Sequence, residues 1–452
     1  MGQRLGALDQ LFLRLETPTT PMHVGGVLIF GSARAKAPRL ETLRAMPVRT
    51  SPFDWVSSPF DWVLAGPRGR QTWEQITGAA PPVGHVRLEP PGDDAALMAA
   101  VSRLHGPHLS RDGMMWECHL IEGLRDDRFA LYYKVHHACI DGVSAIRRLE
   151  RSLSTDPTQP TPPVWAAAPP PRGPRPAPEP RSAGAAGAVR TAVEIGGWLG
   201  RLALAASDRD PGRTASPYTA PSTPLNPLLD RERSVAWCRL PLDGVRAIAH
   251  AAGVTVNEVA LAVCAAVLRS HLAARGALPD RPLVAMIPVS LRGGGDTSGN
   301  QVSSILCKLG TEIADPRERL RAIAKSSAAG KQMIRSMSPA AAAAFSLVYT
   351  LPAVAAQLAG LARLPVLPWN VVVSNVNGPR EQLYYDGAPL EAIYPVSLLF
   401  ERQAVNITLV SCRDHLDIGL LVCPSAAGDV GVLAAGLEQA YRELAAAFGG
   451  QA

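Results

Sequence analysis

Apolar residues follow two different spacings along the chain, and both spacings occur in each half. The apolar run 24–30 and the segment 128–135, RFALYYKV, in which every second residue is large and apolar, are typical of strands. The segments 143–153 and 256–275 repeat their apolar residues at helical spacing. The same criteria predict a helix over 242–252 and strands over 282–288, 302–309, 371–375, 405–411 and 416–423. Strands and helices are mixed in both halves, which predicts an α/β or mixed α+β fold class.

The apolar pattern is interrupted in the middle of the chain. Residues 154–190 are so dense in Pro, Ala and Gly that they favour an extended, polyproline-like tether over a helix or a strand. Residues 187–206 regain helical spacing, and residues 216–227 again favour a loop. We therefore expect an N-terminal lobe over 1–153, a Pro/Ala-rich linker with a helix over 154–227, and a C-terminal lobe over 228–450.

A stretch without any charged side chain covers residues 336–362. Its length would span a bilayer, but Pro352 interrupts it and much of it is Ala, which contributes little transfer energy. Three interpretations are open: a buried or amphipathic helix pair that breaks at Pro352, an interfacial attachment to a membrane, or a transmembrane span. The composition favours the first.

Composition narrows the class of protein. The chain has 452 residues, of which 47% are apolar and 19% charged, so it is too apolar for a disordered protein and long enough for a large core. Its net charge of +6 rests on 40 Arg and only 5 Lys, and the guanidinium group suits phosphates and anionic headgroups. Basic residues are not interleaved with aromatic ones, so no nucleic-acid partner is expected.

The cysteines and the N-terminal residues indicate the compartment. Seven cysteines are scattered and never spaced as C-x-x-C, so neither a disulfide framework nor a zinc site is predicted. The first residues, MGQRLGALDQLF, include Asp9 and lack the long apolar core of a secretory signal. We expect a protein of the reducing cytoplasm.

The segment 134–145, KVHHACIDGVSA, lies between a predicted strand and a predicted helix. Catalytic side chains are often carried by such turns at strand ends. His137 could take a proton from a hydroxyl as that hydroxyl attacks a carbonyl, and Asp141 could fix the local backbone or the imidazole tautomer. The alternative is a pair of buried histidines whose ring nitrogens bond backbone groups.

Other chemistries find less support in the sequence. Adjacent strand residues point to opposite faces, so His136 and His137 are poorly placed to share a metal ion, and no metal site is expected. The chain has no G-x-S-x-G motif, and Cys139 is interpreted as a small apolar filler. An acyl-enzyme is therefore not favoured, and a general-base mechanism is.

The motif HHACIDG at 136–142 resembles the active-site motif of the chloramphenicol acetyltransferase-like superfamily. The resemblance implies that His137 is the general base, that His136 and Gly142 belong to the motif, and that Asp141 is chiefly structural. It also implies two chloramphenicol acetyltransferase-like lobes joined by the Pro-rich linker, with an active-site tunnel between them. The acyl thioester and the acceptor would enter that tunnel from opposite sides.

Further segments are similar to the bacterial wax ester synthase/acyl-CoA:diacylglycerol acyltransferase family, and they extend over nearly the whole chain. They are LDQLFLRLETPTTPMHVGGVLIF at 8–30, WECHLIEGLRDDRFALYYKVHHACIDGVSA at 116–145, TVNEVALAVCAAVLR at 255–269, PVSLR at 288–292, SNVNGP at 374–379 and VNITLVSC at 405–412. The similarity implies an O-acyltransferase that moves a long fatty acyl group from coenzyme A to a fatty alcohol, a diacylglycerol or both. It implies no cofactor, because acyl-CoA is a substrate. The water-insoluble products imply peripheral attachment to the inner membrane or to lipid droplets.

These segments contain further candidate site residues. Asn257 and Glu258 begin a predicted helix, where they either support the motif or act as a helix cap and a first-turn acid. Glu258 stands where the family usually has Asp. Gly25 and Gly26 allow close approach of a ligand or accommodate a bulge.

Three candidate substrate-binding residues lie in the second half. Arg292 ends a strand and could meet an anionic group or bridge to Asp141, and the alternative is a solvated arginine. Ser374 and Asn375 follow an apolar run, and their alternative role is in a turn.

Two other functions remain to be weighed against acyl transfer from coenzyme A. A condensation-type enzyme would use an acyl group bound to a carrier protein, but the PMHVGG opening and the missing carrier domain argue against it. A non-catalytic lipid-binding protein on the same scaffold would not need the intact HHACIDG motif.

Overall fold

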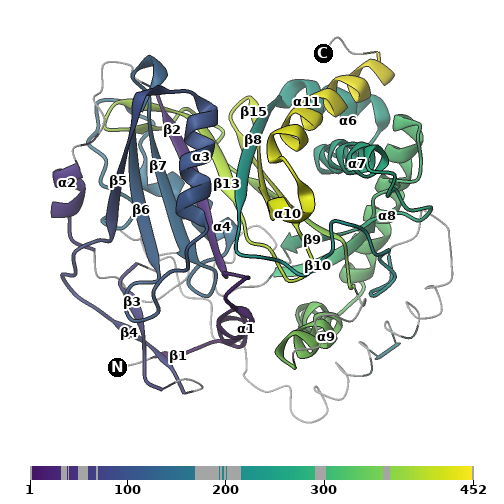
Figure 1. Ribbon diagram of the computed structural model, residues 1–452, viewed down its shortest axis with the longest axis horizontal. Coiled ribbons are helices and arrows are strands. Elements are labelled where there is room, and N and C mark those ends of the chain that lie inside the picture. Colours follow the sequence, from purple (N-terminus) through teal and green to yellow (C-terminus); the bar gives the residue numbers. More distant parts are fainter. Residues whose placement is uncertain are drawn as a thin grey trace.

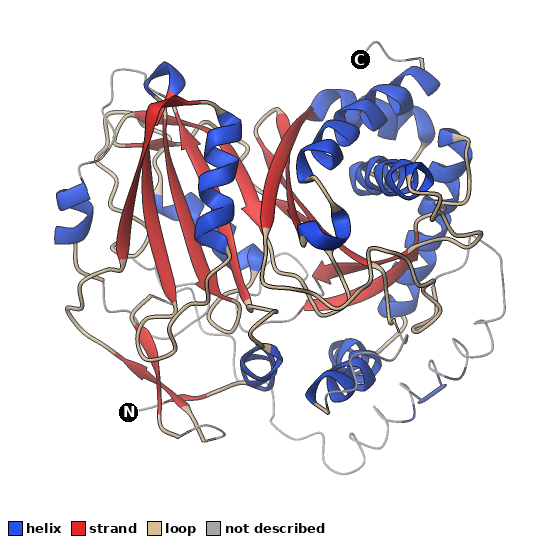
Figure 2. Ribbon diagram, in the orientation of Figure 1, coloured by secondary structure: helices blue, strands red, loops and turns tan. Residues whose placement is uncertain are grey.

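Two lobes stand side by side, and each is built on a six-stranded sheet (Figure 1). The computed structural model describes residues 3–31, 38, 40–48, 60–67, 70–167, 193, 196–197, 200, 215–290, 302–359 and 367–449. Strands and helices occur in both lobes (Figure 2), which confirms the predicted fold class.

The sheet of the N-terminal lobe has the strand order β12-β13-β2-β7-β6-β5. The strands are β12 (Tyr384–Tyr385), β13 (Ala388–Val396), β2 (His23–Phe30), β7 (Phe129–His136), β6 (Trp116–Leu124) and β5 (Val83–Gly92). On β7, Phe129, Leu131 and Tyr133 pack in one apolar cluster, whereas Ala130 and Tyr132 pack in another. Both faces of this sheet are therefore buried, and the alternation along 128–135 separates two cores.

The sheet of the C-terminal lobe has the order β10-β9-β11-β14-β15-β8. The strands are β10 (Val302–Lys308), β9 (Val284–Ser290), β11 (Val371–Asn377), β14 (Val405–Cys412), β15 (His415–Val422) and β8 (Ser234–Pro241). Four helices pack beside it: α6 (Leu242–Ala252), α7 (Val256–Ala274), α8 (Pro316–Arg335) and α11 (Val430–Ala447).

Helix α7 runs through the centre of these helices, and its apolar side chains lie in the largest core cluster. Among the described residues it is the helix long and apolar enough to cross a membrane, and 67% of its most apolar window is buried inside the protein. Its composition is that of a core helix.

Shorter elements complete the described part of the chain. They are α1 (Ala7–Leu15), α2 (Leu40–Ala45), α3 (Asp94–His105), η1 (Arg125–Asp127), α4 (Gly142–Ser152), α9 (Pro339–Leu358), α10 (Pro424–Ala427) and a small sheet of β1 (Gln3–Arg4), β4 (Thr72–Gln75) and β3 (Trp62–Ala65).

Strand β13 joins the two lobes. It comes from the C-terminal half of the chain but pairs with β2, so that Val396 lies opposite Gly25. The expected division into 1–153 and 228–450 therefore does not describe residues 384–396, which belong to the first sheet. The placement of β13 follows from its long-range pairing with β2. The local spacing of apolar residues does not indicate which strand a given strand pairs with.

The start of the expected linker packs against the N-terminal lobe. Trp165 is fully buried in the same apolar cluster as Phe129, and Arg148 donates to the carbonyls of Val164 and Ala167 at 3.1 and 3.0 Å. Burial of a Trp side chain anchors residues 154–167, so these residues are not a free tether. The stretch 168–192 lies outside the described residues, as does most of the helix expected over 187–206.

Helix α9 differs from the expected helix pair. It runs without a break from Pro339 to Leu358 and contains Pro352. A proline inside a helix removes one backbone hydrogen bond, but the helix can continue where its other turns are held. Gln357 Nε2 donates to the Leu15 carbonyl of α1 at 3.1 Å, which is one such restraint.

Candidate active site

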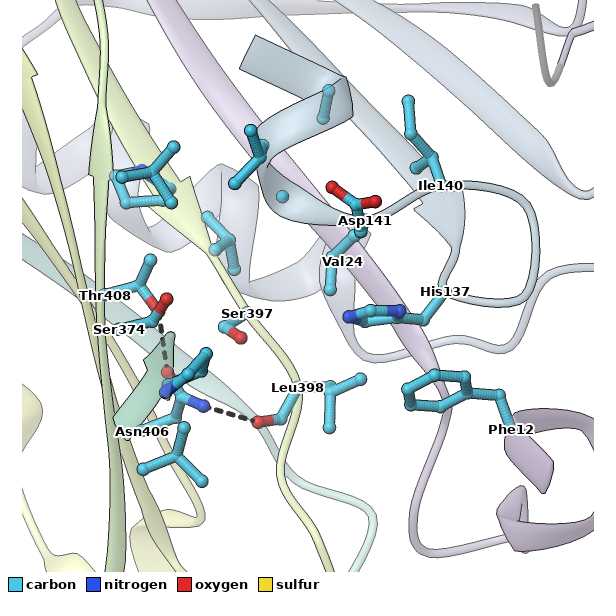
Figure 3. A pocket seen from close by; sticks show the side chains of 18 of the residues that line it. Phe12, Val24, His137, Ile140, Asp141, Ser374, Ser397, Leu398, Asn406 and Thr408 are labelled. Atoms are coloured by element: carbon cyan, nitrogen blue, oxygen red, sulfur yellow. Dashed lines mark hydrogen bonds between the residues drawn. The ribbon is translucent and has the colours of Figure 1, made fainter. Parts of the chain in front are cut away.

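The turn between β7 and α4 presents His137 to a large cavity. Every residue from Phe129 to Asp141 is buried except His137, which is partly exposed. The cavity measures about 1410 Å³ and is lined by residues of both lobes. In Figure 3 the His137 ring projects into it from the turn, on the same side as Asp141.

The contacts of His137 fix its backbone and one ring face. Its N–H donates to the Met22 carbonyl at 2.8 Å, and its ring stacks on Phe12 with 4.2 Å between centroids. Nδ1 is buried and has no hydrogen-bond partner in the described part of the chain. Burial lowers the pKa of His137 below 6.5, although the charge of Asp141 acts in the opposite direction. The imidazole is therefore neutral near pH 7 and available as a base.

Asp141 caps helix α4. One carboxylate oxygen accepts the Ser144 N–H at 2.8 Å, and the other accepts the Ser144 hydroxyl at 3.1 Å. Asp141 lines the cavity, but these bonds are those of an N-cap residue. Gly142 is the first helical residue and also lines the cavity.

His136 points away from the cavity. Its ring is buried, Nδ1 accepts the Ala138 N–H at 3.1 Å, and Nε2 lies 3.6 Å from a carboxylate oxygen of Glu16. His136 and His137 therefore face different surroundings. Sequence reasoning did not find Glu16.

The two glycines of β2 have different neighbours. A Cβ on Gly25 would lie 2.7 Å from the Tyr133 carbonyl, so a side chain does not fit. A Cβ on Gly26 would meet nothing within 4 Å and would enter the cavity. The strand pairs with β7 in regular register from His23 to Phe30, so neither glycine accommodates a bulge.

Strand β11 contributes Ser374 and Asn375 to the opposite wall. Asn375 Nδ2 donates to Asn257 Oδ1 at 3.4 Å, which brings the first turn of α7 behind the cavity wall. Glu258 instead caps the N-terminus of α7 and pairs with Lys331 at 3.0 Å. Among the candidates, Arg292 lies outside the described residues.

Several lining residues lie in segments that sequence reasoning did not single out as part of the site. In Figure 3, Asn406 and Thr408 of β14 lie across the cavity from His137, with Ser397 between the two walls. The Thr408 hydroxyl donates to Asn406 Oδ1 at 2.9 Å, and Asn406 Nδ2 donates to the Leu398 carbonyl at 3.0 Å. The segment VNITLVSC predicted the strand that is β14, but no sequence pattern placed this strand near His137.

Most of the remaining lining is aliphatic or aromatic. Helix α1 contributes Leu8, Leu11, Phe12 and Leu15, and helix α9 adds Val354. A lining that is mostly apolar suits a long hydrocarbon chain. The site therefore combines a neutral histidine with space for an acyl chain, which is what an enzyme of acyl transfer requires.

The fold is that of condensation domains and their relatives. The starter condensation domain of rhizomide synthetase RzmA is 12% identical and matches with a TM-score of 0.58 over 99% of this chain and 94% of that one. The first condensation domain of the CDA synthetase is 16% identical, with a TM-score of 0.58 over 98% and 96%. At these identities the likeness is one of fold alone.

Closer comparisons show the family. The wax ester synthase/diacylglycerol acyltransferase catalytic domain matches residues 5–260, and the C-terminal domain of that family matches 298–445. A wax ester synthase/diacylglycerol acyltransferase from Marinobacter aquaeolei VT8 is 34% identical, with a TM-score of 0.76 over 99% of this chain and all of that one. A Mycobacterium tuberculosis protein with the name "probable diacylglycerol O-acyltransferase tgs2" is 36% identical over 98% of each chain. The chain belongs to the wax ester synthase/diacylglycerol acyltransferase family and is an acyltransferase.

Proposed function

We propose that this acyltransferase moves a long-chain acyl group from acyl-CoA to the hydroxyl of a diacylglycerol, a fatty alcohol or both. The observation that carries the proposal is the neutral, partly exposed imidazole of His137 in an apolar cavity of about 1410 Å³. The names of the relatives support both acceptor classes.

In the proposed reaction, His137 takes the proton of the acceptor hydroxyl. The hydroxyl oxygen forms a bond to the thioester carbonyl carbon, and the carbon–sulfur bond of acyl-CoA then breaks. The proton passes from the imidazolium to the leaving thiolate, so the products are an ester and free coenzyme A. General-base assistance of this kind contributes about 10²–10⁴-fold to the rate.

The other candidate residues have supporting roles in this proposal. Asp141 and Gly142 start α4 and thereby set the turn that carries His137. Gly26, Ser374 and Asn375 border the substrate path. The reaction needs neither a resident cofactor nor a metal ion, because acyl-CoA itself supplies the activated acyl group.

We further propose that the protein works in the cytoplasm, attached peripherally to the inner membrane or to lipid droplets. Helix α9 supports this, because Thr350 and Val354 line the cavity while Leu351 is 52% exposed beside them. One helix thus reaches from the cavity to the surface. Release by alkaline carbonate is expected, and retention in the pellet would contradict peripheral attachment.

Product analysis tests the proposed function directly. Purified protein is supplied with one acyl-CoA and, in parallel, with a diacylglycerol and a fatty alcohol, and the esters are identified by mass spectrometry. A parallel reaction with the same acyl group on an acyl-carrier protein tests the condensation-type alternative. Ester formation from acyl-CoA supports the proposal, whereas lipid binding without turnover, or transfer from the carrier protein alone, contradicts it.

A further inference from the structure

We propose that Glu16 is a positioning residue for His137, acting through the backbone of Met22 and the ring of His136. The inference rests on the proposed role of His137 as the general base. Glu16 does not line the cavity, and its side chain is only 7% exposed. It lies at the C-terminal end of helix α1, whose Phe12 stacks on the His137 ring.

The two carboxylate oxygens of Glu16 have different partners. Oε2 accepts from the guanidinium of Arg111, with 2.8 Å to Nε. Oε1 accepts the Met22 N–H at 3.3 Å and lies 3.6 Å from His136 Nε2. Arg111 thus holds the carboxylate from one side and leaves the other oxygen to face the catalytic turn.

Burial raises the pKa of Glu16, but His136 and Arg111 outweigh it and bring the pKa down to about 2. Lys134 also acts on the group electrostatically. The carboxylate is therefore ionised at any pH at which the protein works.

The first route to His137 runs through Met22. The Met22 N–H bonds Glu16, and the Met22 carbonyl accepts the His137 N–H at 2.8 Å. A single residue, Met22, therefore connects the Glu16 carboxylate to the backbone of the proposed base. A displacement of Glu16 would therefore move the Met22 carbonyl that accepts the His137 N–H.

The second route runs through the imidazole of His136. Because Nδ1 accepts the Ala138 N–H, the proton of the neutral ring belongs on Nε2, which faces Glu16. The ring in turn holds Ala138, the residue after His137. Glu16 therefore favours the His136 tautomer that carries its proton on Nε2, because this tautomer leaves Nδ1 free to accept the Ala138 N–H.

The experiment compares Glu16→Ala and Glu16→Gln in the full-length protein. We expect kcat to fall about 10²-fold in Glu16→Ala with KM nearly unchanged, because a misplaced base costs rate rather than substrate binding. Glu16→Gln keeps one acceptor oxygen and should lose clearly less. Asp417→Asn is the matched control, because Asp417 is likewise buried, paired with Arg239 at 2.7 Å and bonded to the Ile393 N–H. It should lose stability but keep kcat.

A second readout does not depend on activity. Nitrogen-15 spectra of histidine-labelled protein should show His136 with its proton on Nε2 in the wild type and in Glu16→Gln, and a mixture of tautomers in Glu16→Ala. If folded Glu16→Ala keeps the wild-type kcat and the His136 tautomer, the inference is wrong. If His137→Ala proves fully active, the proposed function fails instead, and the spectra still decide whether Glu16 controls His136.

Discussion

The surroundings of His137 determine when it can act as a base. Burial lowers its pKa below 6.5, so the neutral form is the main one at and above that pH. As the pH falls through the lowered pKa, the ring takes a proton and the base is lost.

We therefore expect kcat/KM to be flat near neutral pH and to fall on the acid side with an apparent pKa below 6.5. The measurement is a profile of kcat/KM between about pH 5 and 8, with both acceptor classes. An inflection above 6.5 in both profiles would contradict a buried, neutral His137.

For Asp141 we expect a cost in stability. Asp141→Ala removes both bonds to Ser144, and loss of an N-cap costs about 1 kcal/mol of unfolding free energy, which urea titration can measure. Asp315→Ala is the control, because Asp315 caps α8 in the same way, away from the cavity. Both variants should lose similar stability, and only Asp141→Ala should also lose rate through a displaced turn. An unchanged unfolding curve with complete loss of rate would make Asp141 a direct participant.

Individual site residues were predictable to different degrees. His136, His137 and Asp141 stand within one short motif, so they could be selected as candidate site residues from the sequence. Glu16 lies far from them in sequence and meets His136 only because β2 pairs with β7. A contact between residues so far apart in the sequence does not appear in the local spacing of residue types.

Strand β2 lets one of its faces border the cavity because Gly26 has no side chain. We expect Gly26→Leu to fill part of the substrate space and to lower kcat/KM for long-chain substrates about tenfold or more, with little change for short-chain ones. Measuring kcat/KM over a series of acyl chain lengths checks this. Equal use of long chains by the variant and the wild type would contradict the placement of Gly26.

Gly25, which precedes Gly26 in β2, provides a contrasting control. Gly25→Ala would press a methyl group against the Tyr133 carbonyl, so we expect a loss of stability of about 1–3 kcal/mol. Gly26→Ala should be close to neutral in the same unfolding assay. If both alanine variants lose equal stability, the two glycines do not differ as described.

Seven strands and three helices could be predicted because their apolar residues repeat regularly: β2, β7, β9, β10, β11, β14, β15, α4, α6 and α7. The segment 24–30 became β2, 128–135 became β7, and 256–275 became α7 with little change in bounds. Strands β5, β6 and β8 and helices α1, α3, α8 and α11 were not predicted, and neither was β13, in which Pro389 and Pro395 obscure the strand pattern. For α9, Pro352 suggested a break, but tertiary contacts hold the helix together.

The two lobes depend on each other for the site. The N-terminal lobe carries His137, while Ser374 and Asn406 come from the C-terminal sheet. β13 crosses from one half of the chain into the sheet of the other. The lobes could be predicted from the interrupted pattern, but their joining by β13 could not.

Shortening the middle of the linker should leave this arrangement intact. We expect deletion of 169–180 to keep activity within a few-fold, because the entropy of loop closure changes slowly with length. The packed residues up to 167, including Trp165, are retained in this variant. Acyl transfer is measured on the folded protein, and a folded but inactive variant would show that the segment shapes the substrate entrance.

The central claim is that one imidazole serves both acceptors. Its most direct test is the rate of ester formation by His137→Ala and His136→Ala, each with a diacylglycerol and with a fatty alcohol. We expect His137→Ala to lose about 10²–10⁴-fold with each acceptor that the wild type uses, and His136→Ala to lose less. An inactive His136→Ala beside an active His137→Ala would contradict the account.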